Sequence, residues 1–326
     1  MKREAPFNLP ASVHQRLLNL SQQRGEEFNL LLTRFAIERL LYRLSRSAEA
    51  GHFVLKGALT FAVWGMQPHR PTRDLDLLGY GENTSGRLIE AFRCICDAET
   101  EADGLTFDLD SLRAHPIRLD QEYQGQRVEL NAYLGKARVP LQIDIGFGDI
   151  VTPPAEEAIY PTLLAFPAPR VRVYPKEAVV AEKLHAMIVL GALNSRIKDF
   201  YDLWIMAREL PFEGAVLGRA IKATFARRQT ALPTSRPVAL TAEFAARPDV
   251  QTRWGAFLRR NRLAAGESTF PMVITDLSDF LMPILTALSS AAVFDQAWTA
   301  GGPWCAIGRP RSQQPARSLP AQAEVG

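Results

Sequence analysis

The sequence has few cysteines, few histidines and no long hydrophobic run. Its three cysteines, Cys94, Cys96 and Cys305, lack the paired spacing of a zinc site, which predicts reduced thiols. The five histidines are isolated from one another, and none is assigned to catalysis. No segment approaches the roughly 18 consecutive apolar residues of a membrane span, and no apolar signal core follows the N-terminal charges. These absences predict a cytoplasmic protein with no membrane role.

The rest of the composition is that of a globular protein. The 326 residues are 47% hydrophobic and 22% charged, which is enough for one large domain or two modest ones. The formal net charge of +3 permits an anionic partner but does not require one. The runs Arg227–Arg228 and Arg259–Arg262 are candidate contacts for a nucleic-acid backbone, although such runs are more often solvated surface.

Apolar periodicity divides the chain into four segments. Residues 1–50 are predicted to form N-terminal helices, and residues 51–175 a mixed sheet with helices, with strands at 53–55, 127–133 and 139–146. Residues 176–290 are predicted to be helical, with helices at 176–190, 198–210, 212–228 and 276–288. Residues 291–326 are rich in proline and glycine and have few apolar side chains, which predicts a poorly ordered tail.

The most informative segment carries two acidic residues one position apart. Strand alternation would place Asp74 and Asp76 on one face, with Leu75 and Leu77 directed into the core. Two carboxylates this close repel one another unless a cation neutralises them, and oxygen ligands suit a hard cation such as Mg²⁺. The pair therefore indicates a metal site of the kind that phosphoryl-transfer enzymes use.

The alternative is a solvated turn in which Asp74 and Asp76 pair with Arg70 and Arg73, and for an isolated pair this alternative is favoured. The residues upstream strengthen the metal-site hypothesis. Lys56-Gly57 ends an apolar strand and opens a helix predicted at 58–64, where free backbone N–H groups can bind phosphate. An ordinary strand-to-helix turn explains Gly57 equally well when it is considered alone.

A third carboxylate is available in the segment 141–149. Asp144 lies within an apolar run that is typical of a buried strand, and a buried aspartate needs a partner or a metal ion. We therefore predict Asp144 as the third metal ligand. Asp149 follows two glycines and is interpreted as a turn residue.

The predicted helix 176–190 carries a lysine on its apolar side. Lys183 could contact the triphosphate of a nucleotide or balance the carboxylates, and a surface lysine paired with a neighbouring glutamate is an equal alternative. In the next helix, Asp199 and Asp202 could face the same site, but their spacing alone favours a capping pair. His185 has no partner at ligand spacing and is interpreted as a surface or packing residue.

Taken together and in order, these segments resemble the AbiEii/AbiGii family of nucleotidyltransferase-like toxins, which includes the MenT toxins. The resemblance spans roughly residues 12–210 and rests on five segments: Phe53–Ala58, Arg70–Leu77, Ile143–Asp149, Ala181–Ala186 and Arg196–Leu203. It implies an α+β protein with a polymerase-beta-like nucleotidyltransferase core, a mixed sheet with flanking helices, and a helical C-terminal half. The core would occupy residues 51–175, between the N-terminal helices and a C-terminal domain at 176–290.

The resemblance also implies roles for individual residues. Asp74 and Asp76 would bind the metal, Lys183 would contact the nucleotide, and Asp199 would be a further catalytic acid. Many members of the family have Gly-Ser where this chain has Gly57-Ala58, so a hydroxyl contact to phosphate is lost here.

The resulting hypothesis is a Mg²⁺-dependent toxin that transfers a nucleotide from a nucleoside triphosphate to the 3′ end of tRNA and releases pyrophosphate. The triphosphate would be held by Lys56, Gly57, Ala58, Arg73 and Lys183. The resemblance further implies a protein antitoxin encoded nearby. Transfer to a protein or a small molecule, or a noncatalytic nucleotide-binding regulator, are the alternatives.

Overall fold

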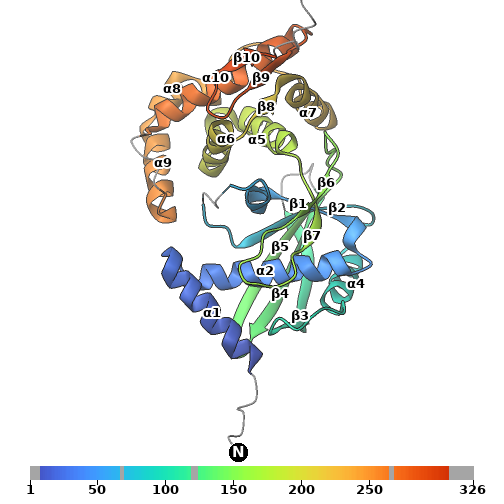
Figure 1. Ribbon diagram of the computed structural model, residues 1–326. Coiled ribbons are helices and arrows are strands. Elements are labelled where there is room, and N and C mark those ends of the chain that lie inside the picture. Colours follow the sequence, from blue (N-terminus) through green and yellow to red (C-terminus); the bar gives the residue numbers. More distant parts are fainter. Residues whose placement is uncertain (1–7, 67–69, 119–123, 264–267, 308–326) are drawn as a thin grey trace, which may run out of the picture.

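The computed structural model describes residues 8–66, 70–118, 124–263 and 268–307. Figure 1 shows two halves, one built on a large sheet and the other helical, with the C-terminal helices above the sheet. Each half has its own cluster of buried hydrophobic side chains. The division predicted at residue 175 falls at the start of the first helix of the second half.

The first half contains a seven-stranded mixed sheet. The strand order is β3 (Leu105–Arg118), β4 (Gln124–Leu134), β5 (Ala137–Phe147), β2 (Asp74–Gly79), β1 (Phe53–Lys56), β7 (Arg170–Val173) and β6 (Glu156–Ile159). The central strand β2 pairs antiparallel with β1 and parallel with β5. A strand flanked on both sides is buried on its core face, so residues on β2 are held in a fixed register.

Helices cover this sheet; some precede it in the chain and others lie between its strands. They are α1 (Leu9–Arg24), α2 (Phe28–Arg46) and α4 (Ser85–Cys96), with the short helices η1 (Ala50–His52), η2 (Gly57–Leu59) and α3 (Thr60–Val63). Gly25, at φ +65°, ends α1 in the left-handed conformation that glycine adopts without strain. Helix α2 contacts β5, β7 and α4, and it crosses the sheet in Figure 1.

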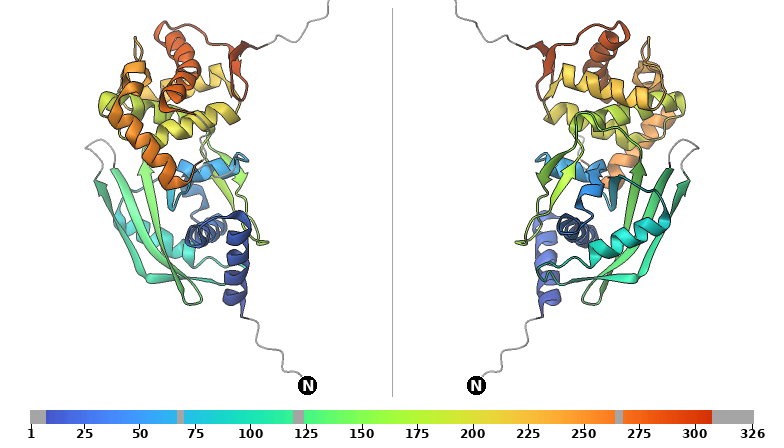
Figure 2. Two further views of the ribbon diagram at one scale, coloured as in Figure 1. Left: turned by 90° about the vertical axis from the view of Figure 1, so that its left-hand side faces the viewer. Right: turned by 90° about the vertical axis from the view of Figure 1, so that its right-hand side faces the viewer.

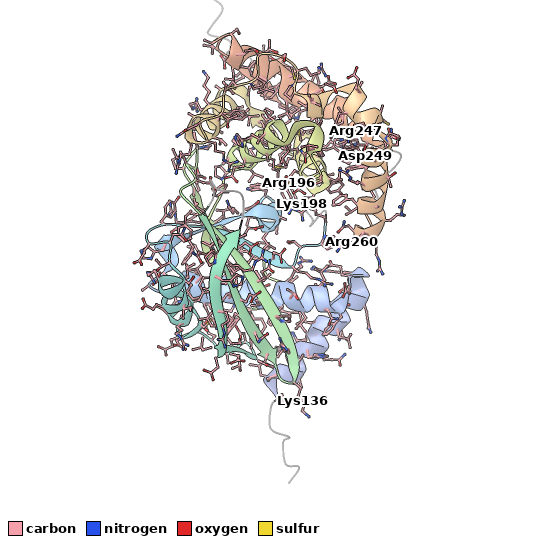
Figure 3. All side chains as sticks on the ribbon, turned by 180° about the vertical axis from the view of Figure 1, so that it is seen from behind. Lys136, Arg196, Lys198, Arg247, Asp249 and Arg260 are labelled. Carbon is pink, nitrogen blue, oxygen red and sulfur yellow. The ribbon has the colours of Figure 1, made fainter. Side chains whose placement is uncertain are left out.

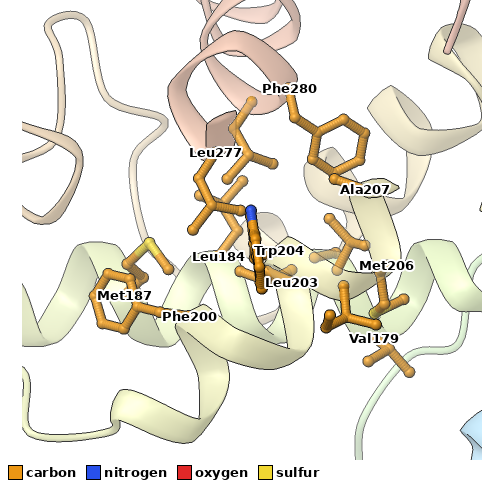
Figure 4. Close-up of a cluster of buried hydrophobic side chains, with 14 of the residues drawn as sticks. Val179, Leu184, Met187, Phe200, Leu203, Trp204, Met206, Ala207, Leu277 and Phe280 are labelled. Carbon is orange, nitrogen blue, oxygen red and sulfur yellow. The ribbon is translucent and has the colours of Figure 1, made fainter. Parts of the chain in front are cut away.

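The second half consists of helices around one apolar core. Its helices are α5 (Lys176–Leu190), η3 (Gly191–Leu193), α6 (Ile197–Glu209), α7 (Gly214–Arg227), η4 (Val238–Leu240), α8 (Ala242–Ala246), α9 (Pro248–Asn261) and α10 (Phe270–Ser289). Side chains from α5, α6 and α10 interdigitate in Figure 4. The two views of Figure 2 show α9 descending from this half toward the N-terminal helices.

The fold prediction is confirmed in its class, because the chain is a mixed sheet with flanking helices and a helical C-terminal half. The expected strands at 53–55, 127–133 and 139–146 lie within β1, β4 and β5. The helix expected at 212–228 begins later, because residues 212–213 form the edge strand β8 (Phe212–Glu213). Helix α4 and strand β3 were not predicted.

The prediction of a poorly ordered tail is wrong for residues 296–306. These residues form β9 (Gln296–Trp298) and β10 (Trp304–Ala306), which join β8 in a small sheet. The reason is aromatic packing, since Trp298 and Trp304 both pack against Phe280 of α10. The part of the predicted tail from residue 308 onward lies outside the described residues.

Replacing Trp298 by alanine is expected to destabilise the second half. The side chain is 5% exposed, and its indole Nε1 donates to the Ala207 carbonyl. Truncating a buried tryptophan costs about 3 kcal/mol of unfolding free energy, and chemical denaturation would measure it. An unchanged denaturation midpoint would contradict the packing role of this strand pair.

One helix among the described residues is long and apolar enough to cross a membrane by length and composition. This is α10, of which half is buried within the protein. Its Asp276 accepts a hydrogen bond from the Trp204 indole of α6 at 2.8 Å, and its apolar residues belong to the core of the second half. These contacts are those of a core helix.

Candidate active site

Strand β2 carries the predicted acidic pair in the expected alternation. Leu75 and Leu77 are each 1% exposed, whereas Asp74 is exposed and Asp76 is half-buried. Because side chains alternate along a strand, both carboxylates lie on the face opposite the two leucines. The alternation predicted for this segment is confirmed, while its metal-binding role stays a prediction.

Neither arginine of the solvated-turn alternative pairs with these aspartates. Arg70 donates to Asp202, 132 positions further along the chain, at 2.7 and 2.9 Å. Arg73 pairs with Glu27 at 2.9 Å, and both of these side chains are more than half exposed. The two carboxylates of β2 are therefore not neutralised by the arginines next to them in the sequence.

Asp76 occupies an electrostatically unusual position. It lies opposite Lys56 of β1 on one side and Asp144 of β5 on the other. Burial raises the pKa of the Asp76 carboxyl, the carboxylates of Asp144 and Asp74 raise it further, and Lys56 and Lys198 oppose them. The free energy needed to ionise Asp76 would be supplied by a bound cation.

Gly57 lies directly beside Asp76, at the turn from β1 into η2. Its φ is +71°, in the region that glycine tolerates best. A Cβ atom at this position would come within 2.7 Å of Cγ and 2.8 Å of Cβ of Asp76, closer than van der Waals contact. The turn thus requires glycine for two reasons, backbone conformation and space. Ala58 follows in η2, and the hydroxyl of Thr60 donates to the Gly57 carbonyl at 2.8 Å.

The reason given for Asp144 as a metal ligand is wrong in one respect. Its side chain is 25% exposed and has a partner, because the Arg127 guanidinium of β4 donates two hydrogen bonds to it at 2.8 and 2.9 Å. Strand alternation alone did not reveal this neighbour, which comes from a different strand. Metal binding by Asp144 would require the Arg127 contact to be exchanged.

Lys56 belongs to a buried charge network between the two halves. Its Nζ lies 3.2 Å from Asp149 and 3.8 Å from Glu182 of α5, and Asp149 also pairs with Arg228 at 3.3 Å. Burial alone would lower the pKa of Lys56, but Glu182 and Asp149 outweigh it and raise the pKa. Lys56 is therefore charged, beside the glycine turn.

This network changes the interpretation of two residues. Asp149 was expected to be an ordinary turn residue; it does follow a bend at Gly148, but its side chain is only 6% exposed and is ion-paired. Arg228 was a candidate contact for a nucleic-acid backbone, yet its guanidinium is directed into the protein toward Asp149. His185 Nδ1 accepts a hydrogen bond from Arg228, and its Nε2 shares one with the Thr230 hydroxyl, as expected of a packing residue.

A second buried network surrounds Lys183. Its ammonium donates to Asp199 at 2.7 Å and to Asp202 at 2.8 Å, and both carboxylates are at most 2% exposed. Burial alone would lower the pKa of Lys183, but these two carboxylates outweigh it and raise the pKa. The alternative of a surface lysine paired with a neighbouring glutamate is wrong, because the partners come from α6.

The capping interpretation of Asp199 and Asp202 is also wrong. Helix α6 begins after Arg196 and has no side-chain hydrogen bond at its cap. Asp199 instead forms ion pairs with Lys183 and with Arg196, the latter at 2.6 Å. Asp202 forms ion pairs with both Lys183 and Arg70, so α6 is connected to α5 and to the segment before β2.

Asp202→Asn is expected to destabilise the protein at neutral pH. It should also make the free energy of unfolding less dependent on pH in the acidic range. Burial alone would raise the pKa of Asp202, but Lys183 and Arg70 outweigh it and lower the pKa to about 2. An unfolded aspartate has a pKa of about 3.9, so this stabilisation, on the order of 2–3 kcal/mol, is present above pH 4 and is lost as the pH falls toward 2.

Urea denaturation between pH 2 and pH 7 would measure both effects. Asp249→Asn is the matched control, because Asp249 also pairs with two arginines but its side chain is 41% exposed. The same acid dependence in Asp202→Asn and wild type would show that this network does not stabilise the fold.

Sequence reasoning missed several members of these networks. The solvated-turn alternative had included Arg70. Arg127 had been noted only as part of a strand, and Asp149 only as a turn residue. The sequence did contain one indication that Asp149 belongs to the site. It follows two glycines at the end of the strand that also carries Asp144. No spacing rule connects Arg70 with Asp202, because they meet only after both halves have folded.

The chain is similar to known nucleotidyltransferases. The family model described as nucleotidyl transferase AbiEii toxin, type IV toxin–antitoxin system, matches residues 39–276. A search of curated proteins finds no match. A crystal structure from H. pylori described as a candidate nucleotidyltransferase is 14% identical, with a TM-score of 0.47, and covers 81% of this chain and 98% of its own. The crystal structure of JHP933 from Helicobacter pylori has the same identity and TM-score, with 80% and 94% covered.

Proposed function

The chain belongs to the AbiEii family of nucleotidyltransferase toxins of type IV toxin–antitoxin systems, and from this premise we propose that it transfers a nucleotide from a nucleoside triphosphate to RNA. The observation that carries the proposal is the contact between Gly57 and Asp76. It places a glycine turn, where backbone N–H groups can receive phosphate, against an acidic residue whose pKa is raised by burial. A metal-bound triphosphate needs both features side by side.

The acidic face of β2 suits Mg²⁺. Asp74 and Asp76 supply hard oxygen ligands, and Mg²⁺ commonly uses one or two protein carboxylates together with substrate phosphates. Within the described part of the chain no cluster of three acidic, histidine or cysteine side chains is already assembled, so the pair is the core of the proposed site. Asp144 would join it on release from Arg127. When bound, Mg²⁺ would neutralise charge on the phosphates and lower the barrier to attack.

The remaining residues of the site would bind and orient the nucleotide. The backbone of Gly57 and Ala58 would receive phosphate oxygens, and the buried charge of Lys56 lies behind that turn. Lys183 would attract the triphosphate, and Asp199 would hold its ammonium in place. Arg73 is exposed near Asp74 and can exchange Glu27 for a phosphate.

In the proposed reaction, the 3′-hydroxyl of the acceptor attacks the α-phosphorus of the triphosphate. The new O–P bond forms as the bond to pyrophosphate breaks, and the hydroxyl proton passes to solvent. The 3′ end of tRNA is the proposed acceptor, in the cytoplasm, and a protein antitoxin is the proposed genetic partner. Transfer to a protein or small molecule uses the same site with a different acceptor.

The direct test is transfer of labelled nucleotide. Purified protein would be incubated with each α-labelled nucleoside triphosphate, Mg²⁺ and total RNA, with protein and small-molecule acceptors in parallel. Label on RNA 3′ ends together with released pyrophosphate is the expected result. Nucleotide binding by calorimetry without transfer to any acceptor would favour the noncatalytic regulator and overturn the proposal.

A further inference from the structure

A cavity of about 690 Å³ opens beside Asp74, between the end of α9 and the N-terminal helices. One wall is formed by the end of α9 and the residues after it, and the opposite wall by the turn between α1 and α2. Figure 3 shows Arg260 at the end of α9 that faces the N-terminal helices. The walls come from both halves of the protein.

Five arginines line this cavity, and they differ in whether they pair with a carboxylate of the protein. Arg34, Arg70 and Arg73 are paired with Glu26, Asp202 and Glu27. Arg260 and Arg262 are exposed, and neither forms an ion pair or side-chain hydrogen bond with any residue that the structure describes. The wall on α9 therefore offers two cations available to an anionic ligand.

The backbone contributes to this placement. Arg262 caps α9 in the left-handed conformation at φ +52°, which is uncommon for a residue with a side chain. The turn ends the helix and leaves Arg260 and Arg262 on the cavity wall, whereas their neighbour Arg259 is exposed but does not line the cavity. One short segment thus contains both cavity-lining and external arginines.

The cavity adjoins the proposed nucleotide site and extends beyond it. Its wall shares Ala58, Arg73 and Asp74 with that site but does not include Gly57, Asp76 or Lys183. A ligand in the cavity would therefore reach the acidic face of β2 at Asp74. It would lie next to the proposed triphosphate, where an attacking hydroxyl group has to be placed.

We propose that this cavity is the acceptor groove, in which a single-stranded RNA 3′ end lies with its terminal hydroxyl at Asp74 and its phosphates on Arg260 and Arg262. The inference rests on the proposed function, since it assigns the acceptor of that reaction to a surface. The half-buried Leu263 adds apolar surface on which an unstacked base can pack, beside the buried Leu30, Leu59 and Tyr160. A blunt duplex keeps its bases stacked inside and cannot use this surface.

The test is RNA binding measured without nucleoside triphosphate, so that it does not depend on turnover. Fluorescence anisotropy would compare a hairpin RNA with an unpaired 3′ overhang and the same hairpin with a blunt end. Wild-type protein is expected to prefer the overhang. Arg260→Ala and Arg262→Ala are each expected to weaken binding of the overhang roughly tenfold and to reduce the salt-dependence slope by about 1.

Arg259→Ala is the matched control, because it removes the same charge from the next residue outside the cavity. Equal weakening by Arg259→Ala and Arg260→Ala would overturn the groove, since it would indicate a general effect of charge. Unchanged RNA binding in both cavity variants would also overturn it. Weaker binding of nucleoside triphosphate, with RNA binding unchanged, would assign the arginines to the triphosphate instead.

The proposed function and the groove can fail separately. If no nucleotide transfer occurs but overhang binding depends on Arg260, the surface binds RNA and the catalytic proposal fails. If transfer occurs normally in Arg260→Ala and Arg262→Ala at limiting acceptor concentration, the catalytic proposal stands and the groove is wrong. In steady-state measurements the groove predicts a raised KM for the acceptor with kcat unchanged.

Discussion

Replacing Asp76 by asparagine is expected to reduce the rate of nucleotide transfer by roughly 10³- to 10⁵-fold. This is about the loss of kcat that follows removal of one essential charged group in phosphoryl transfer. The asparagine side chain would keep the size of the aspartate but lose the negative charge proposed to hold Mg²⁺. Because the pKa of Asp76 is raised by burial, the neutral amide should cost little fold stability. The measurement is kcat for label transfer, with the melting temperature recorded in parallel.

The matched control for this variant is Asp110→Asn. Asp110 is an exposed aspartate of β3, remote in sequence from the acidic pair, so the same chemical change should leave kcat unchanged. Transfer by Asp76→Asn at the wild-type rate would sink the proposal that β2 carries the metal site. Loss of activity accompanied by loss of the folded state would call for binding of Mg²⁺ and nucleotide to be measured by calorimetry on a folded Asp76→Glu variant.

Replacing Gly57 by alanine is expected to reduce transfer by about 10²-fold, as expected when a reacting group is displaced by about 1 Å. The added Cβ would meet the Asp76 side chain, and the positive φ would be strained as well. Overpacking of this kind also lowers the free energy of unfolding by about 1–3 kcal/mol. Both kcat and the denaturation midpoint should therefore fall.

The chain offers a control that separates strain from collision. Gly65 has φ +75°, close to the φ of +71° at Gly57, but a Cβ at Gly65 would meet nothing within 4 Å. Gly65→Ala thus imposes similar backbone strain without disturbing Asp76, and activity should be retained. If the two alanine variants lose equal activity, the contact with Asp76 is not what makes Gly57 necessary.

Much of the fold could be predicted because its elements carry local signals. Helix α2, within the N-terminal helices predicted at 1–50, and the strands at 127–133 and 139–146 have apolar periodicities that few other conformations can bury. Strand alternation similarly predicted that Asp74 and Asp76 share a face. The tail was mispredicted because Trp298 and Trp304 are isolated in sequence. They stabilise the segment by packing against Phe280, which lies on a different element.

The ion pairs of the candidate site could not be predicted in the same way. Lys183 was correctly placed on the apolar side of its helix, but its partners Asp199 and Asp202 lie on another helix. Arg127 reaches Asp144 from the neighbouring strand, which neither segment indicates by itself. A polar residue in an apolar segment signals that a partner exists without saying which one.

The sequence by itself determined the family, the class of the fold and the acidic pair on β2, because ordered motifs and side-chain alternation depend only on residues close together in the chain. The tertiary structure decided what surrounds that pair. It placed Gly57 against Asp76, buried Lys56 and Lys183 in separate networks, and brought Arg260 of α9 to a cavity beside Asp74. Electrostatic energy depends on distance in space, and these distances are set only when the two halves have packed together.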